Sequence, residues 1–238
     1  ALPFSALPLD SFYYRAWVVF LYLLIVGAVL LRGRRLVIPL CAGTVTLILS
    51  LIFTALTFQA GKLTAVVLDV GQGQSVLLGS GDFLALVDCG GDSYNDAGDT
   101  ASNYIQSLGR GRLDLLVLSH YHSDHANGVP QLLRRLEVGE IALPDVEEDS
   151  PLRQEILALA EEQGCRVRFI RSDTTYTLEE GQTVTLYAPL GQGTDTNELG
   201  LAVLASAGDA DVLITGDMGG SAEQLLLEHA ALPGVELL

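Results

Sequence analysis

Positive charge is scarce in this sequence and unevenly placed. The 238 residues include 13 Lys and Arg against 29 Asp and Glu, a formal net charge of −16. Residues 1–61 hold four arginines and a single acid, Asp10, whereas residues 62–238 hold nine basic and 28 acidic residues. The net charge of residues 62–238 is therefore negative and cannot by itself attract a polyanion. If this part acts on nucleic acid, metal ions or a partner must attract the substrate, although the acidity could also serve solubility only.

Cysteine and methionine are also scarce. The three cysteines, Cys41, Cys89 and Cys165, lack metal-site spacing, and their odd number argues against a disulfide framework. We expect all three to be buried small apolar residues. The only methionine is Met218, so no initiator residue is present, and we expect the chain to be a fragment of a longer protein.

Two long apolar runs precede the acidic part. Residues 36–58 form 23 positions without a charge, and such a length crosses a bilayer core of about 30 Å. The run at 12–31 is long enough only if Arg15 extends toward the interface. A buried helix of a soluble protein is the alternative, but such helices are rarely so long and uncharged. The sequence therefore predicts that residues 1–61 form two transmembrane helices, at about 12–31 and 36–58.

The link between the two runs carries three positive residues, Arg32, Arg34 and Arg35. Positive residues in short loops stay on the cytoplasmic side of a membrane. Both outer ends of the hairpin then face away from the cytoplasm. We therefore expect a multi-pass protein of the cell membrane in which residues 62–238 form an extracytoplasmic domain.

From residue 62 onward the pattern is that of an α/β domain. Gly-rich turns separate short apolar runs typical of strands, and later segments alternate strands with amphipathic helices. The helix expected at 152–163 has Ser150 as its N-cap, Pro151 in its first turn and Gly164 beyond its end. The other expected elements are strands at 63–70, 75–78, 83–87, 113–118, 184–188, 201–205 and 212–215, and helices at 101–108 and 221–231.

A cluster of histidines follows the apolar strand expected at 113–118. His120, His122 and His125 lie within six residues, with Asp124 among them. Imidazole and carboxylate groups suit zinc, manganese and iron, and loops at strand ends place side chains in one crevice. A single loop histidine is usually surface decoration, but three together predict a metal site. The fourth histidine, His229, lies on an expected helix and is predicted to be solvated.

The spacing His120-x-His122-x-Asp124-His125 resembles the signature of the metallo-β-lactamase superfamily. The resemblance covers roughly residues 62–238. It implies an α/β fold, the metallo-β-lactamase-like αββα sandwich, incomplete at the C-terminus and preceded here by the two transmembrane helices.

Two further aspartates occur in the order that this superfamily shows. Asp88 ends an expected strand and resembles its structural aspartate, and Asp217 resembles the later aspartate that bridges two metal ions. The resemblance thus implies two divalent metal ions, manganese or zinc. The implied ligands are His120, His122 and Asp217 for one ion, and Asp124, His125 and Asp217 for the other.

The implied ligand set suits phosphodiester hydrolysis. Two divalent cations about 3.5 to 4 Å apart can activate water at neutral pH and stabilise the transition state. Asp124 could also orient the attacking water and is the candidate catalytic residue. Asp69 and Asp88 are expected to be supporting or structural groups, since an aspartate at a strand end often caps backbone N–H groups.

The stretch Leu68-Asp69-Val70-Gly71-Gln72-Gly73 narrows the resemblance. It is similar to the opening of the hydrolase domain of the ComEC family of competence channels, which take single-stranded DNA across the membrane. That domain is thought to degrade the strand left outside. The resemblance implies a metal-dependent nuclease whose partners are DNA, the membrane, other parts of the same polytopic chain and the competence machinery.

The chain departs from the family pattern in three places. Gln74 replaces an aspartate of many relatives, and Asn197, expected to be a supporting or structural residue, occupies the slot of another ligand histidine. The last ligand is expected in a histidine–glycine segment beyond residue 238. Two other functions stay open: another superfamily hydrolase, such as a β-lactamase, thioesterase or glyoxalase, or a DNA-docking transport subunit with a non-catalytic hydrolase domain.

Overall fold

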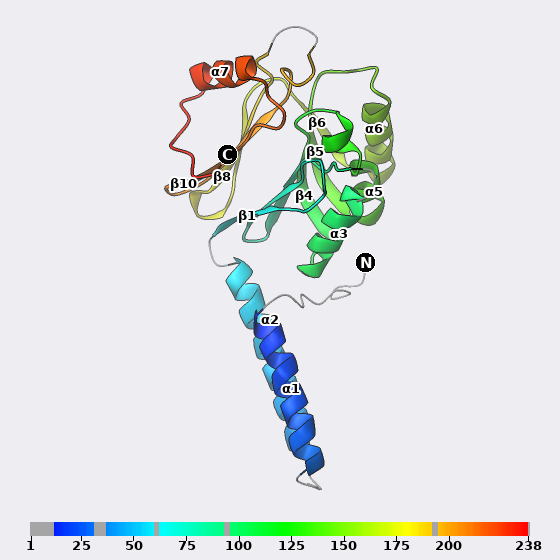
Figure 1. The fold of residues 1–238 in the computed structure, drawn as a ribbon, viewed down its shortest axis with the longest axis vertical. Coiled ribbons are helices and arrows are strands. Elements are labelled where there is room, and N and C mark those ends of the chain that lie inside the picture. The colour runs from blue at the N-terminus through cyan, green and yellow to red at the C-terminus, as the bar shows by residue number, and fades with distance from the viewer. Residues whose placement is uncertain (1–11, 31–36, 60–61, 93–95, 192–194, 238) are drawn as a thin grey trace.

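A computed structural model of the chain describes residues 12–30, 37–59, 62–92, 96–191 and 195–237. The chain begins with two helices, α1 (Phe12–Leu30) and α2 (Val37–Gln59), which pack against each other as a hairpin. An α/β domain follows, and the hairpin projects from it (Figure 1).

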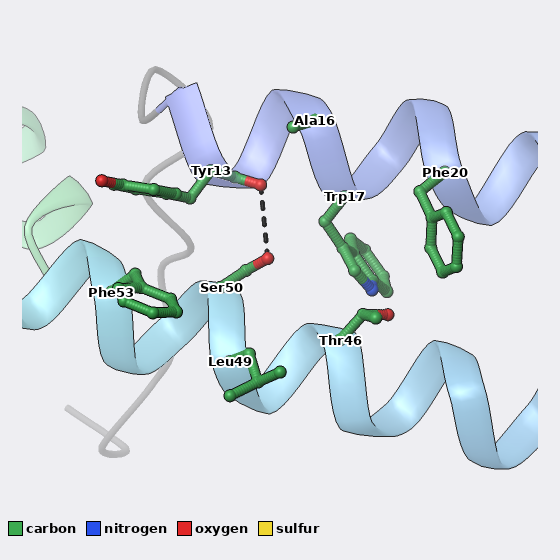
Figure 2. Close-up of a pocket in the computed structure, with 8 residues that line it drawn as sticks. All are labelled: Tyr13, Ala16, Trp17, Phe20, Thr46, Leu49, Ser50 and Phe53. Carbon is green, nitrogen blue, oxygen red and sulfur yellow. Dashed lines mark hydrogen bonds between the residues drawn. The ribbon is translucent and has the colours of Figure 1, made fainter.

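The two helices of the hairpin are joined by polar and aromatic contacts. The indole Nε1 of Trp17 donates to the carbonyl of Gly43 at 3.0 Å, and Ser50 Oγ donates to the carbonyl of Tyr13 at 3.3 Å. The rings of Tyr13 and Phe53 stack with centroids 5.6 Å apart. Between the helices lies an apolar groove that Trp17 and Phe53 help to line (Figure 2).

The membrane-spanning prediction concerns these two helices. Within the part of the chain that the structure describes, no helix is both long enough and apolar enough to cross a membrane. The structure does not describe the side chains at 12, 14, 28–30, 37–40 and 54–59, and the arginine-containing link 31–36 also lies outside the described residues. The two predicted spans and their orientation stay predictions.

The domain is built on two β-sheets. The first has the strand order β1-β2-β3-β4-β5-β6, with β1 to β3 antiparallel and β3 to β6 parallel. The second is antiparallel in the order β10-β9-β8-β7. The strands are β1 (Leu63–Val67), β2 (Val76–Ser80), β3 (Phe83–Val87), β4 (Arg112–Val117), β5 (Glu137–Pro144), β6 (Arg166–Ile170), β7 (Thr174–Thr177), β8 (Thr183–Tyr187), β9 (Ala202–Ala207) and β10 (Ala210–Ile214).

Helices cover the outer face of each sheet (Figure 1). The first sheet packs against one group of helices through a core that includes Leu86, Leu116 and Ile141, and the two sheets share a second core that includes Val87 and Val203. The helices are α3 (Ala97–Ser107), α4 (Ser123–Ala126), α5 (Val129–Arg135), α6 (Pro151–Gln163), the single turn η1 (Glu179–Gly181) and α7 (Gly220–His229), which lies on the second sheet. The predicted α/β layers, helix, sheet, sheet and helix, are confirmed.

The local signals for α6 are confirmed. Ser150 Oγ accepts from the backbone N–H of Arg153, Pro151 opens the helix, and Gly164 ends it with φ of 67°. The prediction of buried cysteines holds only for Cys89. Cys165 is partly exposed, and Cys41 is exposed because it lies on α2, whose main packing partner is α1.

A buried carboxylate ties the two sheets together at their β6 and β7 edges. Glu140 on β5 is only 7% exposed. Its carboxylate accepts from the hydroxyl of Tyr176 on β7 at 2.6 Å and from Arg168 Nε at 2.6 Å, and it pairs with Arg166 at 3.0 Å. Burial opposes the charge of Glu140, but the hydrogen bonds from Tyr176 and Arg168 and the two arginine charges outweigh it and lower the pKa below 4.5.

We predict that Glu140→Gln lowers the free energy of unfolding by about 2 kcal/mol at neutral pH, because it removes charge-assisted hydrogen bonds. A lowered folded-state pKa gives stability that is present above the unfolded value of 4.5 and lost as the pH falls through the folded value. The difference between wild type and variant should therefore shrink below pH 4.5 in denaturant titrations.

The matched control is Glu155→Gln. Glu155 pairs with Arg134, but both side chains are about half exposed, at 50% and 53%, so its loss should cost less than about 1 kcal/mol. Equal effects of the two substitutions, or a Glu140→Gln effect that grows in acid, would contradict the prediction.

Candidate metal centre

The histidine cluster lies where β4 ends. Ser119 and His120 follow the strand, His122 precedes the short helix α4, and His125 lies within it. The parallel pairing of β3 with β4 brings Asp88, the residue after β3, to the same edge of the sheet. Asp217 comes from the second sheet, just beyond β10. The side chains therefore meet from three separate stretches of the chain.

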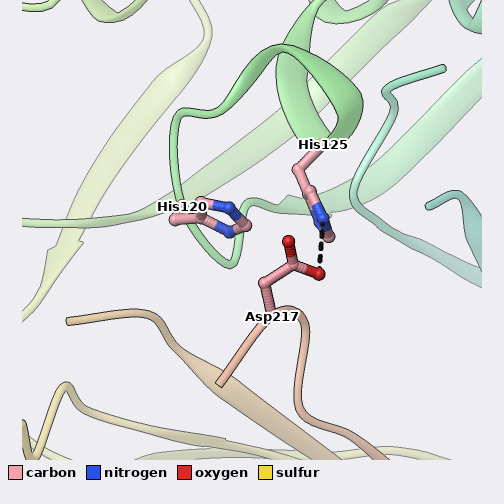
Figure 3. Close-up of side chains that lie close together, drawn as sticks. All are labelled: His120, His125 and Asp217. Carbon is pink, nitrogen blue, oxygen red and sulfur yellow. Dashed lines mark ion pairs between the residues drawn. The ribbon is translucent and has the colours of Figure 1, made fainter. Parts of the chain in front are cut away.

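Three of the predicted ligands converge most closely. One ligand atom from each of His120, His125 and Asp217 lies within 4.8 Å of the other two. The His125 Nε2 to Asp217 Oδ1 distance is 3.1 Å, and Figure 3 shows the carboxylate pointing between the two rings. His120 and His125 are buried, while the Asp217 side chain is 43% exposed. The two histidines are thus shielded from solvent, and the cluster is open to solvent on the side of Asp217.

The other two predicted ligands flank this group. The ring of His122 meets that of His120 edge to face, with centroids 4.6 Å apart. The Asp124 carboxylate is half exposed, and its Oδ2 lies 4.0 Å from His125 Nε2. The structure thus brings three of the predicted ligands, His120, His125 and Asp217, into one group, with His122 and Asp124 beside it.

A buried hydrogen-bond network holds the two inner histidines. The Asp88 carboxylate, with no exposed surface, accepts from the backbone N–H of Ser119 at 2.7 Å and from its hydroxyl at 2.6 Å. Nδ1 of His125 lies 2.7 Å from the same carboxylate, and Nδ1 of His120 lies 2.9 Å from Ser119 Oγ. Because Ser119 gives its proton to Asp88, its oxygen is left to accept from His120 Nδ1–H.

This network leaves the Nε2 atoms of both rings facing the centre. Nε2 of His120 is buried and has no hydrogen-bond partner in the described residues, which is costly for a polar atom unless a ligand satisfies it. Burial first, and then the nearby charge of His125, lowers the pKa of His120 to about 4. His120 is therefore neutral at physiological pH, the form in which imidazole binds metal. The donor set fits a divalent metal ion.

The pKa of His125 is shifted in the opposite direction. Burial disfavours its charged form, but the hydrogen bond and charge of Asp88, with the charges of Asp217 and Asp124, outweigh burial and raise its pKa. A cation at this position is thus stabilised by three carboxylates. The same arrangement would favour a metal ion that replaces the proton on Nε2.

Two glycines allow the loops to approach this closely. A Cβ at Gly90, two residues after Asp88, would overlap the backbone of Asp124 and His125. Gly216 has φ of 59°, and a Cβ there would lie 2.8 Å from Ser119 Oγ. Both positions therefore require glycine for the metal-centre loops to keep their places.

The three residues predicted to be supporting or structural differ in their contacts and in their exposure. Asp88 holds His125 and Ser119, whereas Asp69 is exposed and lies outside the metal-ligand cluster. Asn197 is partly buried, and its side-chain oxygen has no hydrogen-bond partner in the described residues. Its neighbour Thr196, which sequence reasoning missed, is the residue that contacts His122. Ser119 was also missed, although its position directly before His120 could have indicated it.

Residues 68–235 match the family model described as the metallo-β-lactamase superfamily. Among solved structures, the chain is similar to the metallo-β-lactamase fold protein YhfI from Bacillus subtilis, with 20% identity and a TM-score of 0.44 over 63% of this chain and 61% of that one. It is also similar to CmlA, a diiron β-hydroxylase from Streptomyces venezuelae, with 18% identity and a TM-score of 0.47 over 73% of this chain and 34% of that one.

A third similar structure is the Rm3 metallo-β-lactamase, with 19% identity and a TM-score of 0.43 over 63% of this chain and 57% of that one. The chain thus spans less than two thirds of each of these three structures. No curated protein matches the chain in sequence.

We predict that Asp88→Asn weakens binding of zinc or manganese roughly 10- to 100-fold, because the group that orients a ligand histidine is lost. An amide in place of the carboxylate cannot accept from all three donors of Ser119 and His125. Calorimetric titration with each ion measures the effect. Asp69→Asn, at an exposed aspartate outside the cluster, is the control and should bind as wild type does; equal weakening in both variants would refute the assignment.

Proposed function

Because the chain belongs to the metallo-β-lactamase superfamily, we propose that its domain is a metal-dependent hydrolase that cleaves DNA phosphodiester bonds within a DNA-uptake channel of the ComEC type. The observation that carries the hydrolase assignment is the convergence of His120, His125 and Asp217 around a buried imidazole nitrogen that has no hydrogen-bond partner within the described part of the chain. The choice of DNA is supported by the segment 68–73 and by the apolar hairpin that precedes the domain.

The five predicted ligands would hold two divalent ions, manganese or zinc. When bound, such ions polarise a phosphodiester oxygen and make water a stronger acid. His120 and His125 present Nε2 from the buried side, and Asp217 reaches the same point from the second sheet. Asp124 is half exposed and lies beside His125, and we propose that it would accept a hydrogen bond from an attacking water and orient it.

The charge of the domain shapes how DNA would bind. Residues 62–238 carry 28 acidic against nine basic residues, so the bulk field repels phosphates. Divalent ions at the centre would reverse that field locally. DNA binding by this domain should therefore depend on divalent ions more strongly than binding by a basic nuclease domain does.

We also propose that α1 and α2 anchor the chain in the cell membrane, with the domain outside the cytoplasm. The hairpin exposes large apolar side chains along both helices, among them Val19, Leu23, Ile48 and Ile52. Such a surface is unfavourable in water and is satisfied by lipid or by other apolar helices. Other helices of the same polytopic chain and the competence machinery are the proposed neighbours.

We predict that the protein degrades single-stranded DNA with manganese or zinc and loses this activity in chelator. Asp217→Asn should lower the rate at least 100-fold, because its carboxylate reaches the ligand atoms of both inner histidines and would serve both ions. His229→Gln is the control, since His229 pairs with Asp173 on the surface at 2.8 Å and lies outside the cluster. A fluorescently labelled oligonucleotide reports cleavage.

The same assay separates the alternatives. Equal cleavage in chelator, or full activity of Asp217→Asn, would refute the metal-dependent nuclease. Hydrolysis of a β-lactam or a thioester, with no DNA cleavage, would indicate another hydrolase of the superfamily. Metal binding and DNA binding without turnover of any substrate would indicate a DNA-docking subunit.

A separate prediction concerns orientation. Protease added to intact cells should remove the domain formed by residues 62–238, because the only short-loop positive cluster is Arg32, Arg34 and Arg35. An antibody against the domain would follow its loss. Full protection in intact cells, with cleavage only after lysis, would place the domain in the cytoplasm.

A further inference from the structure

A residue outside every motif contacts one of the predicted ligands. Thr196 Oγ1 lies 2.6 Å from Nε2 of His122, although the two residues are 74 positions apart in the sequence. Thr196 belongs to the segment that leads into β9 of the second sheet. Among the described residues, Nδ1 of His122 has no hydrogen-bond partner.

This contact completes a pattern shared by the three imidazoles of the motif. Nδ1 of His120 is held by Ser119, and Nδ1 of His125 is held by Asp88. In each ring one nitrogen is therefore engaged by a neighbouring oxygen. The second nitrogen of His120 and of His125 is Nε2, which lies near Asp217, and the second nitrogen of His122 is Nδ1. Histidines that bind metal usually donate their second ring N–H to such a partner, which fixes both the tautomer and the ring orientation.

We propose that Thr196 is the positioning residue of His122: its hydroxyl oxygen accepts from Nε2–H and leaves Nδ1 unprotonated for a divalent metal ion. This inference rests on the proposed metal centre and assigns to it a residue from the second sheet. His122 would thus present Nδ1, whereas His120 and His125 present Nε2.

The packing around His122 explains why an orienting contact is needed. The ring is only partly buried, and its edge-to-face contact with His120 does not distinguish its two nitrogens. Rotation of the ring about χ2 would exchange each nitrogen with a ring carbon and so move Nε2 away from Thr196. Thr196 is branched at Cβ and stiff about χ1, so its hydroxyl holds a fixed place against Nε2.

The tautomer of His122 tests the contact without any metal ion. The chain has only four histidines, so ¹⁵N-labelled histidine in the full chain in detergent gives a small set of ring signals, which His→Gln variants assign. At alkaline pH the metal-free wild type should show His122 as the Nε2–H tautomer. Thr196→Val should give a mixture of tautomers, and Thr196→Ser should restore the wild-type signal. A predominant Nδ1–H tautomer in the wild type would overturn the proposal.

Metal affinity tests the consequence. Thr196→Val should bind manganese or zinc about 10-fold more weakly than wild type, as loss of an orienting partner does at other metal sites, and Thr196→Ser should bind nearly as wild type does. Thr175→Val is the matched control, because it removes an exposed threonine hydroxyl that bonds Thr185 at 3.0 Å on β7 and β8. Wild-type affinity in Thr196→Val would refute the role of Thr196 alone. If the wild type itself binds neither ion, the metal centre fails and this proposal fails with it.

Discussion

The buried carboxylate of Asp88 is the contact on which the geometry of the centre depends. A carboxylate without exposed surface is costly unless donors surround it, and here the donors are the backbone and hydroxyl of Ser119 and the ring of His125. Asp88 also has φ of 59°, a conformation that a non-glycine residue keeps only when its surroundings impose it. The charge of Asp88 and the positions of two histidine rings are therefore fixed together. The end of β3 and the loop after β4 cannot move independently without leaving that charge unpaired.

The centre is also a joint between the two sheets. The inner histidines belong to the first sheet, while Asp217 and Thr196 come from segments beside β10 and β9 of the second. The apolar core between the sheets sets the distance across which these groups meet. Well-packed cores have few alternative arrangements. The core therefore keeps the Asp217 carboxylate 3.1 Å from the imidazole of His125, although the two residues are far apart in the sequence. Glu140 makes a second polar joint between the sheets, at their β6 and β7 edges.

The proposed function requires an acidic domain to bind a polyanion, and the charges around the centre indicate how it would do so. The carboxylates of Asp88, Asp124 and Asp217 lie near the ring of His125. Their negative charges together favour a cation at the centre. The rest of the domain adds to that negative field, so the field that repels a phosphodiester also concentrates divalent ions. Under the proposed function, an acidic domain of this kind would gain affinity for DNA only where the ions bind. That restriction would confine a phosphodiester to the reactive position instead of spreading it over the surface.

Sequence reasoning succeeded where the signal is local. The strand at Phe83–Val87 and the ends of α6 follow from apolar runs and capping residues, and the motif around His120 identified the loop because its members are close in sequence. The strands β5, β6 and β7 were not predicted. In β6, arginines alternate with apolar residues, and the partner of both arginines is Glu140 on β5, which also accepts from Tyr176 on β7. The role of Thr196 was not predicted for the same reason, because only the packing of the two sheets brings this residue to His122. A motif can thus name the ligands of a centre, but the groups that fix their tautomers depend on contacts between distant segments, and these arise only in the folded chain.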